Sequence, residues 1–325
     1  KLRRELLEDS SKTGPAGEGF AVQKFGNARV SLVGFPSVGK SSMLSKLTDT
    51  QSRVDAAEFT TLTCVPGVLY YNNCKLQLLD LPGIIDGAAH GKGNGRQVLA
   101  VAKASDLLLI VLEPNHGIEQ RRSILRELDA MGIRINRKPP DVTFRHTKVG
   151  GVKLTSTCKL TKIDEQTCRV ILHEYKVHNC ELILREDITA DDFIDVIEGN
   201  RKFIDALFVY NKIDTISMED VDELARRPNS IVVSVNMGLG LDYLLEKIWE
   251  KLELVRVYTK RKGDHPDFDD PIILTKGRKG CDIKAICNTI HKDFINEFKY
   301  ALVWGRSAKF SPQNCGLSRL SLTRS

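Results

Sequence analysis

The sequence predicts an α/β fold in which a mostly parallel sheet is flanked by helices. An apolar run at residues 30–33 leads into the glycine-bracketed loop GFPSVGKS at residues 34–41, and a segment with helical spacing follows. Two more apolar runs, at residues 106–112 and 206–210, have the length and composition of strands that are covered on both faces, which is typical of parallel sheets. Segments with helical periodicity come after them, at residues 120–131 and 239–254. This alternation of strands and helices favours the α/β class.

Length and composition are those of a globular protein. The chain has 325 residues, of which 42% are hydrophobic and 28% charged, enough for one large domain or two to three smaller ones. No apolar run is long enough for a membrane span. The start shows neither an apolar signal segment nor a Met, so we expect the natural N-terminus to lie upstream. The eight cysteines form no C-x-x-C pair, which argues against zinc and favours reduced thiols in the cytoplasm.

The loop at residues 34–41 has the pattern G-x-x-x-x-G-K-[ST] of a phosphate-binding loop. Its two glycines, Gly34 and Gly39, allow backbone N–H groups to point at a phosphate, and the start of the following helix adds its own N–H groups and positive dipole end. Lys40 is expected to reach the β- and γ-phosphates, and the Ser41 hydroxyl to ligate Mg²⁺. The alternative is an ordinary glycine-rich turn with an exposed lysine.

A second motif, DLPG at residues 80–83, follows an alternating apolar segment at residues 75–79. P-loop nucleotidases hold a Mg²⁺-organising carboxylate at such a strand end, which is the role expected of Asp80, and Gly83 would direct a backbone N–H at the γ-phosphate. Four glycines then follow within nine residues, which suits a segment that reorders with the nucleotide state. An ordinary flexible surface loop is the alternative. These glycines are Gly87, Gly91, Gly93 and Gly95.

A third motif, NKID at residues 211–214, follows the apolar run at residues 206–210. The Asp214 carboxylate can accept hydrogen bonds from N1–H and from the 2-amino group of guanine, and adenine has neither group. A buried acid left unpaired makes the wrong base costly, so such a site can discriminate by a factor of roughly 10⁴ or more. The motif therefore indicates a guanine site and disfavours an ATPase.

Charge is distributed unevenly along the chain. Residues 258–325 contain 13 Lys and Arg against 7 Asp and Glu, so this tail carries the whole net charge of +6. A basic tail on a neutral body points to a polyanionic partner such as RNA, and a solvated lysine-rich face is an equal alternative. Residues 139–202 break the strand–helix alternation and are predicted to be an insertion.

Together these motifs resemble the developmentally regulated GTP-binding proteins, which are Obg-type GTPases, and most closely their second subgroup. The resemblance rests on GFPSVGKS at residues 34–41, EFTTLT at 58–63, DLPGII at 80–85 and NKID at 211–214. In addition, YALVWG at residues 300–305 resembles a TGS domain, which is a β-grasp module.

The resemblance implies a domain order for the chain. Residues 1–27 would be the remnant of an N-terminal helical region with a linker. Residues 28–257 would form a P-loop GTPase domain, with an inserted α+β subdomain at about residues 139–202. Residues 258–325 would form the C-terminal TGS domain. Because the sequence leaves the family pattern after Gln313, we expect the closing strand of that domain to be missing.

The resemblance also assigns further residues of the nucleotide site. Thr61 is expected to reach Mg²⁺ and the γ-phosphate, which makes Ser41, Thr61 and Asp80 the metal residues. Lys40, Thr61 and Gly83 would act in catalysis by positioning and electrostatics. Where the family commonly has Cys or Ala, this chain has Val235, whose contact would be a backbone N–H to guanine O6. The additional nucleotide-binding positions are Ser37, Val38, Ser42, Thr60, Asn211, Lys212, Ser234, Val235 and Asn236.

The function implied is GTP binding and hydrolysis to GDP as a conformational switch that acts on translating ribosomes or RNA. Its partners would be dedicated regulatory proteins of the developmentally regulated GTP-binding protein (DRG) family. Ile84 stands where Ras-like enzymes have a water-orienting Gln, and His90 cannot be given that role, so we expect slow intrinsic turnover. Some relatives bind potassium through an Asn at the position of Ser37, which leaves a potassium site open. The alternative function is a nucleotide-gated RNA- or ribosome-binding module for which hydrolysis is incidental.

Overall fold

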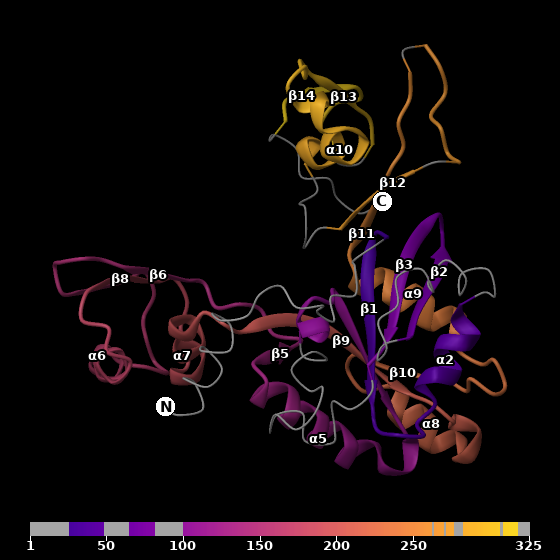
Figure 1. The fold of residues 1–325 in the computed structure, drawn as a ribbon, viewed down its shortest axis with the longest axis horizontal. Helices are drawn as coiled ribbons and strands as arrows, with labels where there is room; N and C mark the ends of the chain where they lie inside the picture. Colours follow the sequence, from indigo (N-terminus) through magenta and orange to yellow (C-terminus); the bar gives the residue numbers. More distant parts are fainter. Residues whose placement is uncertain are drawn as a thin grey trace, which may run out of the picture.

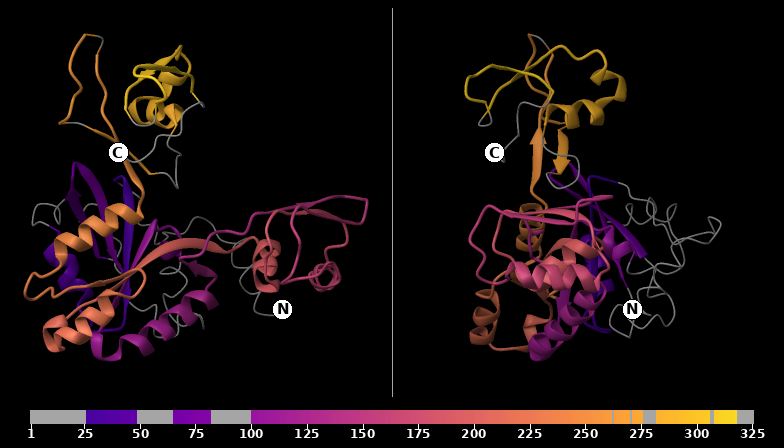
Figure 2. Two further views of the ribbon diagram at one scale, coloured as in Figure 1. Left: turned by 180° about the vertical axis from the view of Figure 1, so that it is seen from behind. Right: turned by 90° about the vertical axis from the view of Figure 1, so that its left-hand side faces the viewer.

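The computed structural model describes residues 26–48, 65–81, 100–261, 263–269, 271–275, 282–305 and 308–317. They form a main α/β unit, an α+β unit inserted into it, and a small C-terminal α+β unit (Figures 1 and 2). Across these ranges, no helix combines the length and the apolar character that crossing a membrane requires.

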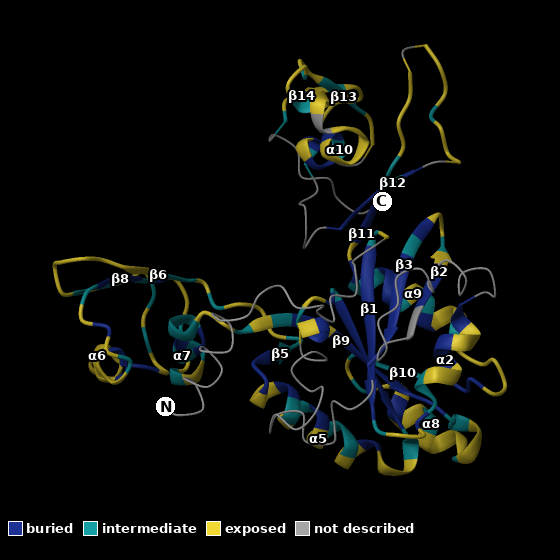
Figure 3. Ribbon diagram, viewed as in Figure 1, coloured by how far each residue is buried: buried dark blue, intermediate teal, exposed yellow. Residues whose placement is uncertain are grey.

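The main sheet has the strand order β10-β9-β4-β1-β3-β2, and β5 pairs with β9 in addition. All neighbours are parallel except β2, which runs antiparallel to β3 at one edge. The central strands are buried along their whole length, as Figure 3 shows, because helices cover both faces. The strands are β1 (Ala28–Gly34), β2 (Val65–Tyr71), β3 (Cys74–Asp80), β4 (Leu107–Leu112), β5 (Ile133–Ile135), β9 (Lys202–Tyr210) and β10 (Ser230–Val232).

Side chains of β4 alternate between two hydrophobic cores. Leu107, Leu109 and Val111 pack on the face covered by α2 (Lys40–Leu47) and α9 (Leu241–Lys251). The intervening residues of the strand pack on the other face, with α5 (Gly117–Ala130) and the end of α8 (Met218–Ala225). This two-sided burial holds the carboxyl ends of the parallel strands in fixed positions.

Two elements differ from what their local sequence favours. Pro66 and Gly67 are turn-prone residues, yet they are part of β2, where a proline is tolerated because the strand lies at the sheet edge. Residues 230–235 are rich in Val and Ile, which favours a strand over the whole segment, yet β10 ends at Val232, because Ser234 leaves the sheet and pairs with Leu239 in an isolated bridge.

The inserted α+β subdomain leaves the main sheet after β5 and returns into β9. It has a three-stranded sheet in the order β6-β8-β7, with two helices packed on one face around Phe193 and Leu182. This confirms the expected insert. Asn136, directly after β5, forms two hydrogen bonds with the Ala206 backbone. Ala206 N donates to Asn136 Oδ1 at 2.8 Å, and Asn136 Nδ2 donates to Ala206 O at 3.0 Å. The elements are β6 (Val142–His146), β7 (Val152–Ser156), α6 (Glu165–Glu174), β8 (Cys180–Leu184) and α7 (Ala190–Glu198).

A buried carboxylate joins the insert to the main unit. Asp195 of α7 accepts hydrogen bonds from Arg134 Nε at 2.6 Å and Nη2 at 2.8 Å, in a bidentate pair. It also accepts one from Arg201 Nε at 2.9 Å. Both arginines belong to segments that run directly into or out of the main sheet. This cluster, which we call the Asp195 clamp, therefore fixes the orientation of α7 at the base of the insert.

The C-terminal unit consists of two antiparallel strand pairs and a helix around one small core. We expected the closing strand to be missing after Gln313. The structure has a short strand there, β14, which begins at Gln313 and pairs with β13. Backbone pairing needs no particular side chains, so a short strand can form there. Lys284 N donates to Leu317 O at 3.1 Å and ties the end to the helix. In the described part of the tail, no strand joins the two pairs. The elements are β11 (Leu254–Val257), β12 (Ile272–Thr275), α10 (Ile283–Ile290), β13 (Ala301–Val303) and β14 (Gln313–Cys315).

Candidate nucleotide site

The described motif residues lie at one edge of the main sheet, where the parallel strands end. The phosphate loop follows β1, Asp80 ends β3, and the segment from Asn211 follows β9. Since β1 pairs with both β3 and β4, and β4 pairs with β9, the three motifs are neighbours in space (Figure 1). The carboxyl edge of a parallel sheet is where α/β proteins bind ligands.

The phosphate loop has a backbone that only certain residues can adopt. Ser37 and Gly39 both have left-handed conformations, with φ of 64° and 95°. A Cβ at Gly39 would lie 2.4 Å from Asn211 Nδ2, and a Cβ at Gly34 would lie 2.5 Å from the Val111 carbonyl oxygen. Both glycines are therefore required by close contacts, and the loop packs against the ends of β4 and β9.

Lys40 bends over the loop that precedes it. Its Nζ donates to the carbonyl oxygens of Gly34 at 2.9 Å and Phe35 at 2.8 Å. Burial lowers the pKa of the Lys40 ammonium, and the nearby Asp80 carboxylate opposes that shift. The partly buried cation would be stabilised by an anionic phosphate above the loop, as expected of a phosphate-binding lysine.

The Ser41 hydroxyl donates to Asp80 Oδ2 at 2.7 Å. The other carboxylate oxygen, Oδ1, is buried and has no hydrogen-bond partner among the described residues. Such an oxygen is costly to bury without a partner. A carboxylate and a hydroxyl are oxygen ligands of the kind that Mg²⁺ prefers. The pair therefore fits the Mg²⁺ that P-loop GTPases normally use.

Asn211 connects the phosphate loop to the loop that follows β10. Its side chain is buried, donates through Nδ2 to Val38 O at 2.9 Å and accepts through Oδ1 from Val235 N at 3.1 Å. Both polar ends of the amide are thus used inside the protein. Asn211 therefore holds the two loops together, and the Val235 N–H that the resemblance assigns to guanine O6 instead donates to Asn211 in this structure.

Two residues of the guanine motif have side-chain partners outside it. The Ser234 hydroxyl, fully buried, donates to Asp214 Oδ1 at 2.5 Å, while Asp214 itself is exposed and accessible to a base. Lys212 has a left-handed backbone with φ of 66°, and its Nζ forms a 3.0 Å ion pair with Glu113 Oε1. Glu113 follows β4 and belongs to no motif, so sequence reasoning missed it. The available signal was its position at the end of β4, a further parallel strand beside the three that carry the motifs.

The remaining assigned positions divide into two groups. Ser42 lies exposed in the first turn of α2, and Asn236 lies exposed in the loop after β10. The others lie outside the residues that the structure describes. These are Thr60, Thr61, Gly83, Ile84, His90 and the four glycines after DLPG.

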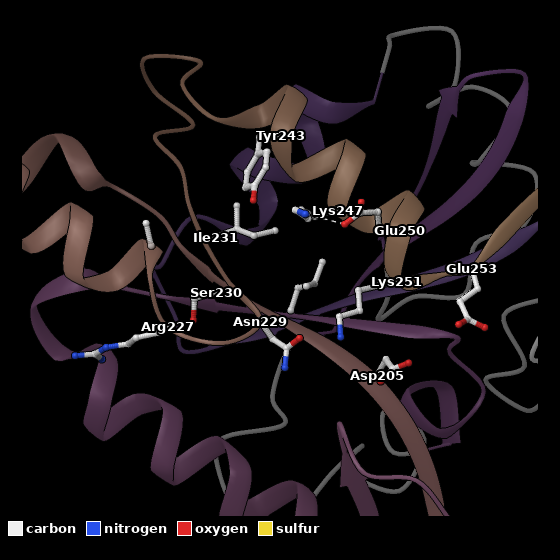
Figure 4. Close-up of a pocket in the computed structure, with 12 residues that line it drawn as sticks. Asp205, Arg227, Asn229, Ser230, Ile231, Tyr243, Lys247, Glu250, Lys251 and Glu253 are labelled. Carbon is white, nitrogen blue, oxygen red and sulfur yellow. Dashed lines mark hydrogen bonds and ion pairs between the residues drawn. The ribbon is translucent and has the colours of Figure 1, made fainter. Parts of the chain in front are cut away.

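A cavity of the described chain lies away from this edge. It has a volume of about 630 Å³ and is lined by the amino-terminal parts of β9 and β10 and by α9 (Figure 4). Its charges are balanced, with three basic and three acidic residues, and Lys247 Nζ donates to Glu250 Oε2 at 2.7 Å. The cavity therefore has no clear preference for an anion such as a nucleotide.

Three family models match the chain. Residues 29–145 match a model described as a 50S ribosome-binding GTPase, residues 149–254 match the C-terminal region of the MMR_HSR1 domain, and residues 255–320 match the TGS domain. Developmentally-regulated G-protein 1 of Arabidopsis thaliana is 54% identical over 98% of this chain and 80% of its own length. This chain belongs to the developmentally regulated GTP-binding protein family.

A second member of the family supports the same assignment. Developmentally-regulated GTP-binding protein 2 of Homo sapiens is 53% identical over 98% of this chain and 86% of its own length. The family and the fold class predicted from the sequence, a P-loop GTPase domain followed by a TGS domain, are therefore confirmed. The chain is a GTP-binding protein with a GTPase domain.

Solved structures show a more distant likeness. The FeoB G-domain from Methanococcus jannaschii is 14% identical, covering 69% of this chain and 96% of its own, with a TM-score of 0.36. Era in complex with MgGDPNP and a segment of 16S ribosomal RNA is 17% identical, covering 86% of this chain and 70% of its own, with a TM-score of 0.38.

Proposed function

We propose that this protein hydrolyses GTP to GDP and phosphate and uses the two nucleotide states as a conformational switch. The observation that carries the proposal is the meeting of Lys40, the Ser41–Asp80 pair and the Asn211–Asp214 segment at one sheet edge. This arrangement offers a cation for phosphate, oxygen ligands for Mg²⁺ and a carboxylate for guanine. Membership in the family supports GTP as the nucleotide.

In this proposal each part of the site has one task. The phosphate loop, from Gly34 to Ser42, cradles the phosphates through its backbone, and Lys40 spreads the charge of the transferring phosphoryl group. Ser41, Thr61 and Asp80 would hold Mg²⁺, which when bound would neutralise charge on the phosphates. Thr61 and Gly83 would orient the γ-phosphate, and Thr60 would belong to the nucleotide-binding set. Asp214 reads guanine beside Lys212, Ser234, Val235 and Asn236.

The intrinsic reaction should be slow, because Ile84 supplies no group to orient water. We expect single-turnover hydrolysis on the order of 10⁻³ s⁻¹ or below in sodium buffer, as for a switch without its activator. Turnover near 1 s⁻¹ in sodium would contradict this. Repeating the measurement in potassium buffer tests whether a potassium site exists, because a rate that is higher in potassium than in sodium requires a bound potassium ion.

We further propose that the switch acts on translating ribosomes or RNA in the cytoplasm, with regulatory proteins of the family as partners. The net charge of the tail and the ribosome-binding GTPase model support this part. We expect the domain order inferred from the sequence to hold, with the tail carrying the RNA affinity. Deleting residues 258–325 should flatten the log–log salt dependence of RNA binding, whose slope is about −0.7 for each neutralised phosphate on single strands.

A nucleotide-gated binding module with incidental hydrolysis is the second candidate. The exposed basic tail favours it, because binding through the tail does not itself need hydrolysis. RNA affinity measured with GDP and with a non-hydrolysable GTP analogue shows whether binding is gated. Multiple-turnover release from RNA with GTP then separates the candidates, since only the hydrolytic switch should require cleavage to dissociate.

A further inference from the structure

The outer face of β13 is apolar, although it faces solvent. Ala301 and Val303 pack on the core of the C-terminal unit, while the alternating residues point the other way. Tyr300 is 59% exposed, and Leu302 and Trp304 are each 46% exposed. A strand with one buried face normally carries polar side chains on its open face. A run of exposed apolar side chains on a globular protein usually marks an interaction site.

The surroundings of this face are basic. Lys260, from the connection between β11 and β12, places its Nζ 4.8 Å from the centroid of the Trp304 ring, in a cation–π contact. Lys299 and Lys309 are exposed on either side of β13 in the chain. From residue 298 to the end, the sequence has five Lys and Arg and no Asp or Glu. The face is therefore complementary to an anion that also has flat apolar surfaces.

We propose that the face formed by Tyr300, Leu302 and Trp304 binds single-stranded RNA by stacking unpaired bases on its aromatic rings. This inference rests on the RNA part of the proposed function and names the form of RNA that is bound. Tyr300 and Trp304 flank β13 and are four residues apart, and four residues of extended chain span roughly 13 Å. That distance suits an extended stretch of a few nucleotides, whose phosphates would contact Lys260, Lys299 and Lys309.

Unpaired RNA fits the face better than a duplex or a protein. Bases inside a duplex are stacked on each other and cannot reach an aromatic side chain, whereas single-stranded sites combine aromatic rings with a positive groove. The centre of a protein–protein interface is depleted of lysine. Here a lysine lies on the ring of Trp304, within the face itself.

The test compares the full chain binding three fluorescent probes: an unstructured 12-nucleotide RNA, a 12-base-pair RNA duplex, and an abasic strand of equal length. We expect the unstructured RNA to bind at least about 5-fold tighter than the abasic strand, the effect of losing one stacked base. Trp304→Ala and Tyr300→Ala should each remove about 5-fold or more of that affinity. Trp304→Phe should retain most of it, and Tyr70→Ala, which removes an exposed aromatic of β2, should have no effect.

The salt dependence separates stacking from charge. Trp304→Ala should weaken binding equally at all salt concentrations, whereas Lys260→Ala should reduce the log–log slope by about 0.7. The two tryptophans, Trp249 and Trp304, provide a readout that needs no loss of a site residue. In a Trp249→Phe variant, the fluorescence of Trp304 should be quenched by the unstructured RNA and unchanged by the abasic strand.

The outcomes distinguish the two proposals. Equal binding of unstructured and abasic strands, with no quenching of Trp304, would overturn the stacking site while leaving RNA binding by the basic tail intact. No binding of any probe would overturn the RNA part of the proposed function together with this inference. If Trp304→Ala left RNA affinity unchanged but lost a protein partner, the face would be a protein interface and the inference wrong.

Discussion

The hydroxyl of Ser234 donates a 2.5 Å hydrogen bond to the carboxylate of Asp214. It joins the loop after β10 to the loop after β9, and a backbone bond from Ile213 N to Val233 O, at 3.3 Å, lies beside it. Ser234 is fully buried and its backbone pairs with Leu239, which fixes its position. The carboxylate that is proposed to read guanine is thus oriented by a neighbour before any base arrives, which reduces the ordering cost of binding.

Replacing Asp214 should change the base that is bound. Asp214→Asn should lose GDP and gain xanthosine diphosphate, because the 2-oxo group of xanthine accepts a hydrogen bond where the 2-amino group of guanine donates one. Affinities for both nucleotides measured by titration calorimetry would show the exchange. An unchanged GDP affinity would remove Asp214 from the guanine site.

Removing the Ser234 hydroxyl should weaken guanine binding without changing the base preference. We expect Ser234→Ala to lower GDP affinity by about 10-fold or more, because a hydrogen bond to a charged group contributes about 1.5 to 3 kcal/mol. Ser230→Ala, at the amino end of β10, is the matched control and should bind GDP normally. Equal affinities of the two variants would show that Asp214 needs no orientation.

Variants of Lys40 and Thr61 should distinguish a residue that is needed to bind any nucleotide from one that is needed only for the GTP-bound state. Lys40→Ala should abolish nucleotide binding, because the phosphates lose their cation. Thr61→Ala should spare GDP and weaken a non-hydrolysable GTP analogue, since Thr61 is expected to contact only Mg²⁺ and the γ-phosphate. Fluorescent-nucleotide titrations test both, and equal losses of GDP and analogue in Thr61→Ala would contradict its assigned role.

The Asp195 clamp should contribute strongly to stability. Asp195→Ala leaves Arg134 and Arg201, both largely buried, with only their outer partners Asp129 and Glu198, and we expect it to lower the free energy of unfolding by about 3 kcal/mol. Asp222→Ala breaks an exposed pair with Arg226 and should cost less than about 1 kcal/mol. Urea denaturation compares the two. Similar small losses would show that the clamp is not a stabilising contact.

Stability should fall at alkaline pH because of Cys74. Burial raises the pKa of its thiol from 9.0 to about 12, so above pH 9 the unfolded chain releases a proton that the folded chain retains. The contribution is complete below pH 9 and declines as pH rises towards 12, by up to about 1.4 kcal/mol per unit. Cys74→Ala should show a correspondingly shallower decline in denaturation midpoint. Parallel pH profiles of variant and wild type would contradict this.

Sequence patterns were sufficient for the strands that carry the motifs. The segments before Gly34, Asp80 and Asn211 are rich in apolar residues, and burial on both faces leaves few other structures for them. Edge elements were harder, because pairing with a neighbour decided them. At Pro66 and Gly67 the local preference is for a turn, yet pairing with β3 makes the segment a strand.

The site was predictable where a residue's chemistry determines its role, and not where a contact depends on the folded arrangement. Lys40, Ser41 and Asp214 follow from the motifs. The ion pair between Glu113 and Lys212 does not, because it joins the ends of two strands that are far apart in the chain. Likewise, the two bonds of Asn211 are visible only once the phosphate loop and the loop after β10 are adjacent.

The way the insert is attached has a consequence for protein engineering. β5 and β9 are parallel neighbours, with Ile135 beside Ile204, so the chain leaves and re-enters the sheet at points roughly 10 Å apart. The insert also has a hydrophobic core of its own. A linker of about a dozen residues, the length that a connection between parallel neighbours needs, could therefore replace it, giving a minimal nucleotide-binding module, or another small domain could be grafted there. An insertion or exchange at the junction of β5 and β9 would change this subdomain in a single genetic event and leave the phosphate loop unchanged.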